Sequence, residues 1–190
     1  AGNPLSSTQA INSVYAVALA AGGSLDNARP GLDFFARLRQ GGQLVPLLAT
    51  QRTLADGRTP IVLRWDYNAL SDQAALQGRP PITVVVPSKG VLAGIYVQGI
   101  SAFAPHPHAA RLWMEYLYSD AGQLGWLRGY CHPIRYNDLA TRNAIPADLA
   151  ARLPAADIYA HAQFPTLAQF TAAQAVITAG WNPIVGVTIK

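Results

Sequence analysis

The clearest pattern in the chain is a run of apolar residues at helical spacing close to its start. They recur every three or four positions: Ile11, Val14, Tyr15, Ala18 and Leu19. This spacing predicts an amphipathic helix, and Ser6, Ser7 and Thr8 lie where its N-cap and first turn belong. Helix starts carry unpaired N–H groups and partial positive charge, so this segment is a candidate anion-binding site. The alternative is a simple helix cap.

Apolar spacing and turn residues predict further elements along the chain. A second helix opens at Pro30 and closes at Gly41-Gly42. Further helical segments are expected at residues 44–53, 68–77 and 109–117, from Ser119-Asp120 onward, and at 147–153 and 166–177. Residues 130–138 are expected to form a loop. Three apolar runs, at 61–65, 82–86 and 92–98, predict β-strands.

Strands that alternate with helices predict an α/β fold with a mixed sheet flanked by helices. In such sheets, ligands gather at the loops that leave the strand ends. Trp65, Asp66 and Tyr67 directly follow the expected strand at 61–65, and they form a second candidate region.

Composition narrows the classes of function. The 190 residues suffice for one domain or two small lobes, and the net charge of +4 comes from twelve arginines and two lysines against ten acidic residues. The arginines are scattered, which argues against a nucleic-acid interface. The apolar runs are too short to cross a bilayer. Because Cys131 is the single cysteine, an internal disulfide and a cysteine-rich metal site are both excluded.

Enzymatic interpretations find little support in the residues. Cys131 and His132 are adjacent, whereas a catalytic thiol and its base are usually distant in sequence. His106 and His108 lack further metal ligands nearby, and Asp66 has no partner carboxylate at short range. Nucleotide-binding and hydrolase motifs are absent from the sequence. We therefore expect a non-catalytic protein with no cofactor and no metal.

Three stretches carry a resemblance to a known family. Residues 3–8 (NPLSST) lead into a helix, residues 60–70 (PIVLRWDYNAL) combine a strand pattern with aromatic residues, and residues 94–123 contain HPHAARLWMEYLYSDAGQ. Together they resemble the C-terminal portion of periplasmic solute-binding proteins of ABC importers, in the iron, polyamine and phosphonate branch. The resemblance spans nearly the whole chain, and residues 94–123 are its most specific part.

The resemblance implies a type II periplasmic-binding-protein fold, with one lobe nearly complete and part of the other. Residues 1–92 would form the second lobe, 93–140 part of the first, and 141–190 helices that cross back. The lobes would close about hinges near Val86 and Gly94. The chain begins where such receptors are half complete, so the natural protein is expected to be longer, or its exposed face covered by another chain. The implied location is the periplasm, and the implied partner is an inner-membrane permease, without nucleic acid or membrane insertion.

The resemblance also bears on the ligand. Ferric receptors of this branch place paired tyrosines where this chain has Trp65 and Asp66, which disfavours iron. A tryptophan face beside a carboxylate suits an ammonium group. With the hydroxyls of residues 6–8, this pair favours a small zwitterion such as an aminophosphonate. Tyr67, Tyr130 and Arg135 are weaker candidate ligand residues.

Several alternatives remain open. Trp65 could pack between the lobes while Asp66 caps the following helix. The ligand could be a ferric ion or a simple oxyanion, and the chain could instead be a ligand-sensing regulatory domain of the same fold.

Overall fold

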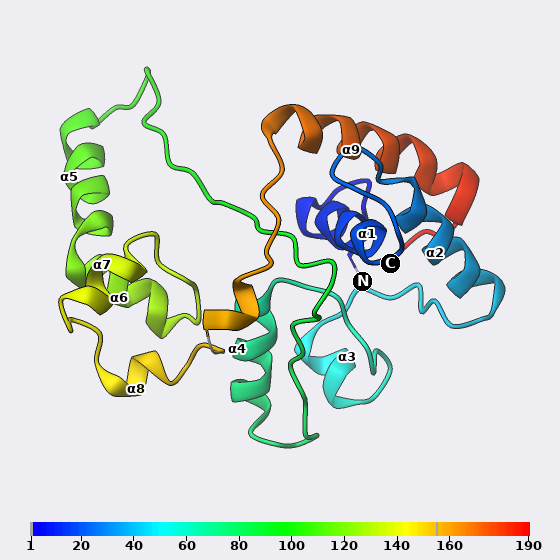
Figure 1. The fold of residues 1–190 in the computed structure, drawn as a ribbon, viewed down its shortest axis with the longest axis horizontal. Helices are drawn as coiled ribbons and strands as arrows, with labels where there is room; N and C mark the ends of the chain where they lie inside the picture. The colour runs from blue at the N-terminus through cyan, green and yellow to red at the C-terminus, as the bar shows by residue number, and fades with distance from the viewer. Residues whose placement is uncertain (1, 155) are drawn as a thin grey trace. The chain divides into compact units, whose positions relative to one another are not determined.

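The computed structural model describes residues 2–154 and 156–190, and it divides the chain into two compact units (Figure 1). The first unit comprises Ala1–Gly94 and Ile158–Lys190, and the second comprises Ile95–Asp157. Secondary structure in the described ranges is almost entirely helical. None of the helices in these ranges combines the length and the apolar character needed to span a membrane.

The first unit is built around three helices that lie side by side (Figure 1). These are α1 (Thr8–Ala20), α2 (Arg29–Gln40) and α9 (Leu167–Gly180), and a π-helical turn (Trp181–Val185) follows α9. Their apolar faces meet in one core, in which Tyr15, Leu32 and Trp181 are fully buried. The expected helices near both ends of the chain are therefore confirmed, because each has an apolar face and a partner for it.

Specific contacts fix the register of this core. A Cβ at Gly31 would collide with the Val14 carbonyl, so α2 approaches α1 where glycine leaves room. The Phe35 and Trp181 rings lie 5.6 Å apart, and Trp181 Nε1 donates to the Val187 carbonyl at 2.8 Å. Arg39 donates to the Val185 carbonyl at 2.6 Å, which ties α2 to the turn after α9.

Two shorter helices complete the first unit: α3 (Gln51–Ala55) and α4 (Asp66–Leu76). Thr50 caps α3, and the hydroxyls of Thr53 and Thr59 lie 2.9 Å apart in a buried contact. Arg64 forms an ion pair with the buried Asp72 of α4, and its guanidinium also donates to the Ala49 carbonyl at 3.2 Å. This pair holds the segment before α4 against the second turn of that helix.

The second unit contains α5 (Pro107–Tyr118), α6 (Asp120–Arg128), α7 (Tyr136–Thr141) and α8 (Ala147–Ala150). A short 3-10 turn (Ala156–Tyr159) follows where the chain returns to the first unit. Ser119 ends α5 and caps α6 through a 3.2 Å bond from the Gly122 N–H. Leu127, Leu139 and Leu149 are buried, whereas α5 buries none of its residues. The apolar core of this unit is therefore small.

The expectation of an α/β fold, type II-like with a mixed sheet flanked by helices, is wrong for the described residues. The runs at 61–65, 82–86 and 92–98 form no ladder, and the pairing is limited to two isolated bridges, Ser24 with Asn27 and Leu92 with Gln163. Val85 and Val97 are 73% and 88% exposed. A local apolar pattern favours an extended backbone, but a strand also needs a neighbour that accepts its hydrogen bonds. None of the described segments provides one.

Candidate functional site

The start of α1 is a capped helix N-terminus, as the sequence predicts. Ser7 is the N-cap, with an extended backbone, and its Oγ accepts from the Ala10 N–H at 3.4 Å. Ser6 and Thr8 are exposed, and Ser7 is half-buried. The N–H groups of Thr8 and Gln9 have no acceptor within the described ranges. The helix-cap interpretation is confirmed, and two donors still point out of the helix end.

Gln9 joins this helix end to the start of α4. Its Oε1 accepts from the Trp65 N–H at 3.0 Å and from the Asn68 side-chain amide at 3.3 Å. Trp65 is the N-cap residue of α4, and its side chain makes no capping bond. Two segments separated by more than fifty residues are thus bonded at their helix starts, so the first turn of α1 and the start of α4 are neighbours.

Trp65 is restrained by close packing of its ring as well as by the hydrogen bond of its backbone N–H. A Cβ at Gly94 would collide with the six-membered part of the indole, so the ring lies directly against the backbone of this glycine. Trp65 as a whole is half-buried. The contact with Gly94 therefore restrains the indole on one side.

Asp66 is the first residue of α4, and its carboxylate accepts two hydrogen bonds. Oδ1 accepts from the Tyr67 N–H at 2.8 Å, and Oδ2 accepts from the Tyr159 hydroxyl at 2.9 Å. Burial raises the pKa of Tyr159, and the negative charge of Asp66 raises it further, so the hydroxyl stays protonated and donates. The first bond satisfies an N–H group in the first turn of α4, but the N-cap residue is Trp65, so Asp66 is not the cap considered from the sequence.

The arrangement combines groups of complementary character. The start of α1 provides backbone N–H groups, and the starts of both α1 and α4 carry partial positive charge, which favours an anion. Asp66 provides a negative charge and Trp65 an aromatic face, which favour an ammonium group. Tyr67 lies in the first turn of α4 and is half-buried. None of these groups is an activated nucleophile paired with a base, so the geometry suits binding.

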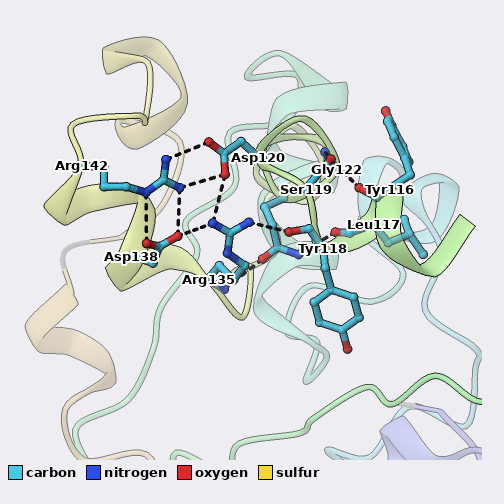
Figure 2. A network of polar contacts seen from close by, with 10 residues as sticks. Tyr116, Leu117, Tyr118, Ser119, Asp120, Gly122, Arg135, Asp138 and Arg142 are labelled. Atoms are coloured by element: carbon cyan, nitrogen blue, oxygen red, sulfur yellow. Dashed lines mark hydrogen bonds and ion pairs between the residues drawn. The ribbon is translucent and has the colours of Figure 1, made fainter. Parts of the chain in front are cut away.

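Arg135 lies in the second unit, at the centre of a polar network (Figure 2). Its guanidinium donates to the Tyr118 carbonyl at 2.5 Å and pairs with Asp120, at 3.1 Å, and with Asp138. Arg142 closes the network with bonds of 2.8 and 2.9 Å to the same two carboxylates. Hydrogen bonds from Arg142 and Arg135 lower the pKa of Asp138 to about 2. The guanidinium of Arg135 therefore links α5, α6 and α7.

Tyr130 also lies in the second unit, immediately after α6. Its backbone is left-handed, with φ of 66°, and the N–H groups of Tyr130 and Cys131 return to the carbonyls of Leu127 and Trp126. This bond pair is a Schellman motif, which usually places glycine or asparagine at this position. The guanidinium of Arg152 lies 5.6 Å from the centre of the Tyr130 ring. The local contacts of Tyr130 thus close the end of α6.

The histidines and Cys131 are the remaining chemical candidates considered from the sequence. Within residues 2–154 and 156–190, no three His, Cys, Asp or Glu side chains are grouped closely enough to hold a metal ion. The His132 ring contacts that of Tyr136 at 5.3 Å, and the Cys131 thiol lies 3.8 Å from the Gly129 carbonyl.

Three residues of the candidate site were missed by the sequence analysis: Gln9, Asn68 and Tyr159. Their contacts with the site cross 56, 59 and 93 positions of the chain, so no local pattern indicates them.

No protein-family model matches the chain, and no curated protein sequence matches it.

Proposed function

We propose that the chain is the extracytoplasmic solute-binding component of an ABC importer, which delivers its solute to a permease in the membrane. The solute is a small anion or zwitterion, with an amine-bearing anion such as an aminophosphonate as the favoured class. The anionic end would lie at the starts of α1 and α4, beside Ser7 and Thr8. The ammonium group would lie between the Trp65 ring and the Asp66 carboxylate.

The observation that carries this function is the bridge made by Gln9. The 3.0 Å bond from the Trp65 N–H to Gln9 makes the hydroxyl-rich start of α1 a neighbour of Trp65 and Asp66. The sequence resemblance of residues 3–8, 60–70 and 94–123 to solute receptors supports the same function. The sheet of those receptors is not part of the proposal, since the described residues form none.

Calorimetric titration tests the ligand class directly. The panel contains 2-aminoethylphosphonate, inorganic phosphate, putrescine and ferric citrate. We expect 2-aminoethylphosphonate to bind most tightly, because it alone offers both charges at short range. Binding of ferric citrate alone would contradict the zwitterion proposal, and no binding of any probe would contradict the function.

Matched cap variants locate the binding site. Ser7→Ala and Ser119→Ala each remove an N-cap hydroxyl that accepts one backbone N–H, so each should cost about 1 kcal/mol of stability. Only Ser7→Ala should also weaken binding of 2-aminoethylphosphonate, since Ser119 lies in the second unit. Equal affinities in the two variants would remove α1 from the site.

A charge variant separates the two ends of the ligand. Asp66→Asn keeps the size of the side chain but removes the negative charge, so it should weaken binding of 2-aminoethylphosphonate at least tenfold. Binding of inorganic phosphate should be retained or strengthened in the same variant. A parallel loss for both probes would show that Asp66 acts only in the fold of α4.

A further inference from the structure

We infer that Gln9 is a positioning residue, whose side-chain oxygen fixes the start of α4 on the first turn of α1 and thereby places Trp65 and Asp66 for ligand binding. The ligand part of this inference rests on the proposed function, whereas the structural part can be tested without any ligand. Gln9 itself is half-buried and lies in the first turn of α1.

The hydrogen bonds of Gln9 show how it acts. A single oxygen, Oε1, accepts one bond from the backbone N–H of Trp65 and one from the side-chain amide of Asn68. These donors lie in the N-cap and first turn of α4, so the two bonds restrain both the position and the rotation of that helix start. Trp65 is the N-cap residue, and in a capping box its N–H would donate to the side chain of the third helical residue, but here the acceptor comes from another helix.

Other contacts also restrain α4, both at its start and further along the helix. The ion pair between Arg64 and Asp72 restrains the second turn of α4. The Tyr159 hydroxyl, 93 positions further along the chain, donates a hydrogen bond to the Asp66 carboxylate. Gly94 restrains the Trp65 ring but not the Trp65 backbone. Gln9 relates the backbone at Trp65 to α1, and we expect its loss to leave α4 folded but displaced at its start.

Two substitutions separate the oxygen from the bulk of the side chain. Gln9→Met keeps the length of the side chain but removes the acceptor, and Gln9→Glu keeps an acceptor oxygen. Gln169 offers a matched control, because this residue is half-buried like Gln9 and its Oε1 accepts the backbone N–H of Thr166, the N-cap residue of α9. Gln169→Met therefore loses a comparable bond away from α4.

The position of the start of α4 can be tested by the rate of hydrogen exchange at the Trp65 N–H. This rate is measured by NMR on the full chain without ligand. We expect Gln9→Met to speed exchange at this amide about five- to tenfold, as loss of one net hydrogen bond does. Gln9→Glu should restore the protection seen in the unmodified chain, and Gln169→Met should leave it unchanged. Unchanged exchange in Gln9→Met would overturn the inference and leave the proposed function standing.

Calorimetry with 2-aminoethylphosphonate completes the test. If the unmodified chain binds this probe, Gln9→Met should bind it at least tenfold more weakly, while Gln169→Met should bind it normally. Equal affinity in Gln9→Met and the unmodified chain would overturn the role of Gln9 in binding. Absence of binding in the unmodified chain would contradict the proposed function. In that case the rate of hydrogen exchange at the Trp65 N–H alone would decide whether Gln9 positions α4.

Discussion

The two units of this chain are stabilised by different kinds of interaction. The first unit packs three helices around a continuous apolar core that contains fully buried Tyr15, Leu32 and Trp181. In the second unit, α5 buries no residue, and an exposed network of Arg135, Arg142 and two aspartates links its helices. Burial of apolar surface is not weakened by charge screening, whereas exposed charge pairs are screened by salt.

The difference matters for the candidate site. Ser7, Gln9, Trp65 and Asp66 all belong to the unit with the larger core, and that core includes residues of α1 but none of α4. Arg135 was a candidate ligand residue, but in the second unit its guanidinium bonds to a carbonyl and two carboxylates. An arginine that holds three helices together contributes chiefly to the stability of its own unit.

The largest expected effect is loss of core packing in the first unit. Leu32→Ala should lower the free energy of unfolding by about 2–5 kcal/mol, because Leu32 is fully buried among α1, α2 and α9. Leu112→Ala is the matched control in the second unit, since Leu112 is 72% exposed, and its effect should stay within about 0.5 kcal/mol. Urea denaturation measures both values, and similar losses would contradict the contrast between the units.

A pair of glycine substitutions should give effects of opposite sign. Gly31→Ala places a methyl group against the Val14 carbonyl and should cost about 1–3 kcal/mol. Gly125→Ala lies within α6 with nothing inside 4 Å of the new methyl, and it should stabilise by about 0.5–1 kcal/mol. Thermal unfolding of both variants provides the measurement. Stabilisation by Gly31→Ala would show that α1 and α2 are less closely packed than the structure describes.

The smallest expected effect is a dependence on pH confined to the second unit. The pKa of Asp138 is lowered to about 2 and that of Asp120 is lowered as well, chiefly by hydrogen bonds from Arg142. Because these folded-state pKa values lie below the unfolded value of about 4, the stabilisation is fully present above that pH and declines as the pH falls towards 2.

Amide exchange in each unit provides the readout for this prediction. Protection of Leu139 should fall as the pH is lowered from about 4 towards 2, after correction for intrinsic exchange rates, and it should also fall in 1 M salt. Protection of Ile177 in the first unit should change less, because its surroundings are apolar. An equal response at Leu139 and Ile177 would contradict the separate origins of their stability.

The elements predicted correctly from the sequence are those with local determinants. The cap hydroxyls of Ser7 and Ser119 lie next to the helices that they start, and the apolar spacing of each helix is visible within one window. The expected strands failed because their pattern specifies an extended backbone but not a partner. Val97 shows the result, since it is 88% exposed on an extended segment.

The candidate site was only partly predictable for the same reason. Ser7, Trp65 and Asp66 could be singled out because each lies at the start of a predicted helix or the end of an expected strand. Their association depends on Gln9, whose partners lie more than fifty positions away. A glutamine in the first turn of a helix is an ordinary solvent-facing residue by any local rule, and only the packed structure gives it a role.

The central claim is that the starts of α1 and α4 form one ligand site in the first unit. A titration of isotope-labelled protein with 2-aminoethylphosphonate, followed by amide NMR, tests it most directly. We expect the largest shifts to occur together at Thr8, Gln9, Tyr67 and Asn68, with the same apparent affinity at each. Shifts centred on Arg135 and Tyr130 in the second unit, or no saturable shift at these four amides, would contradict it.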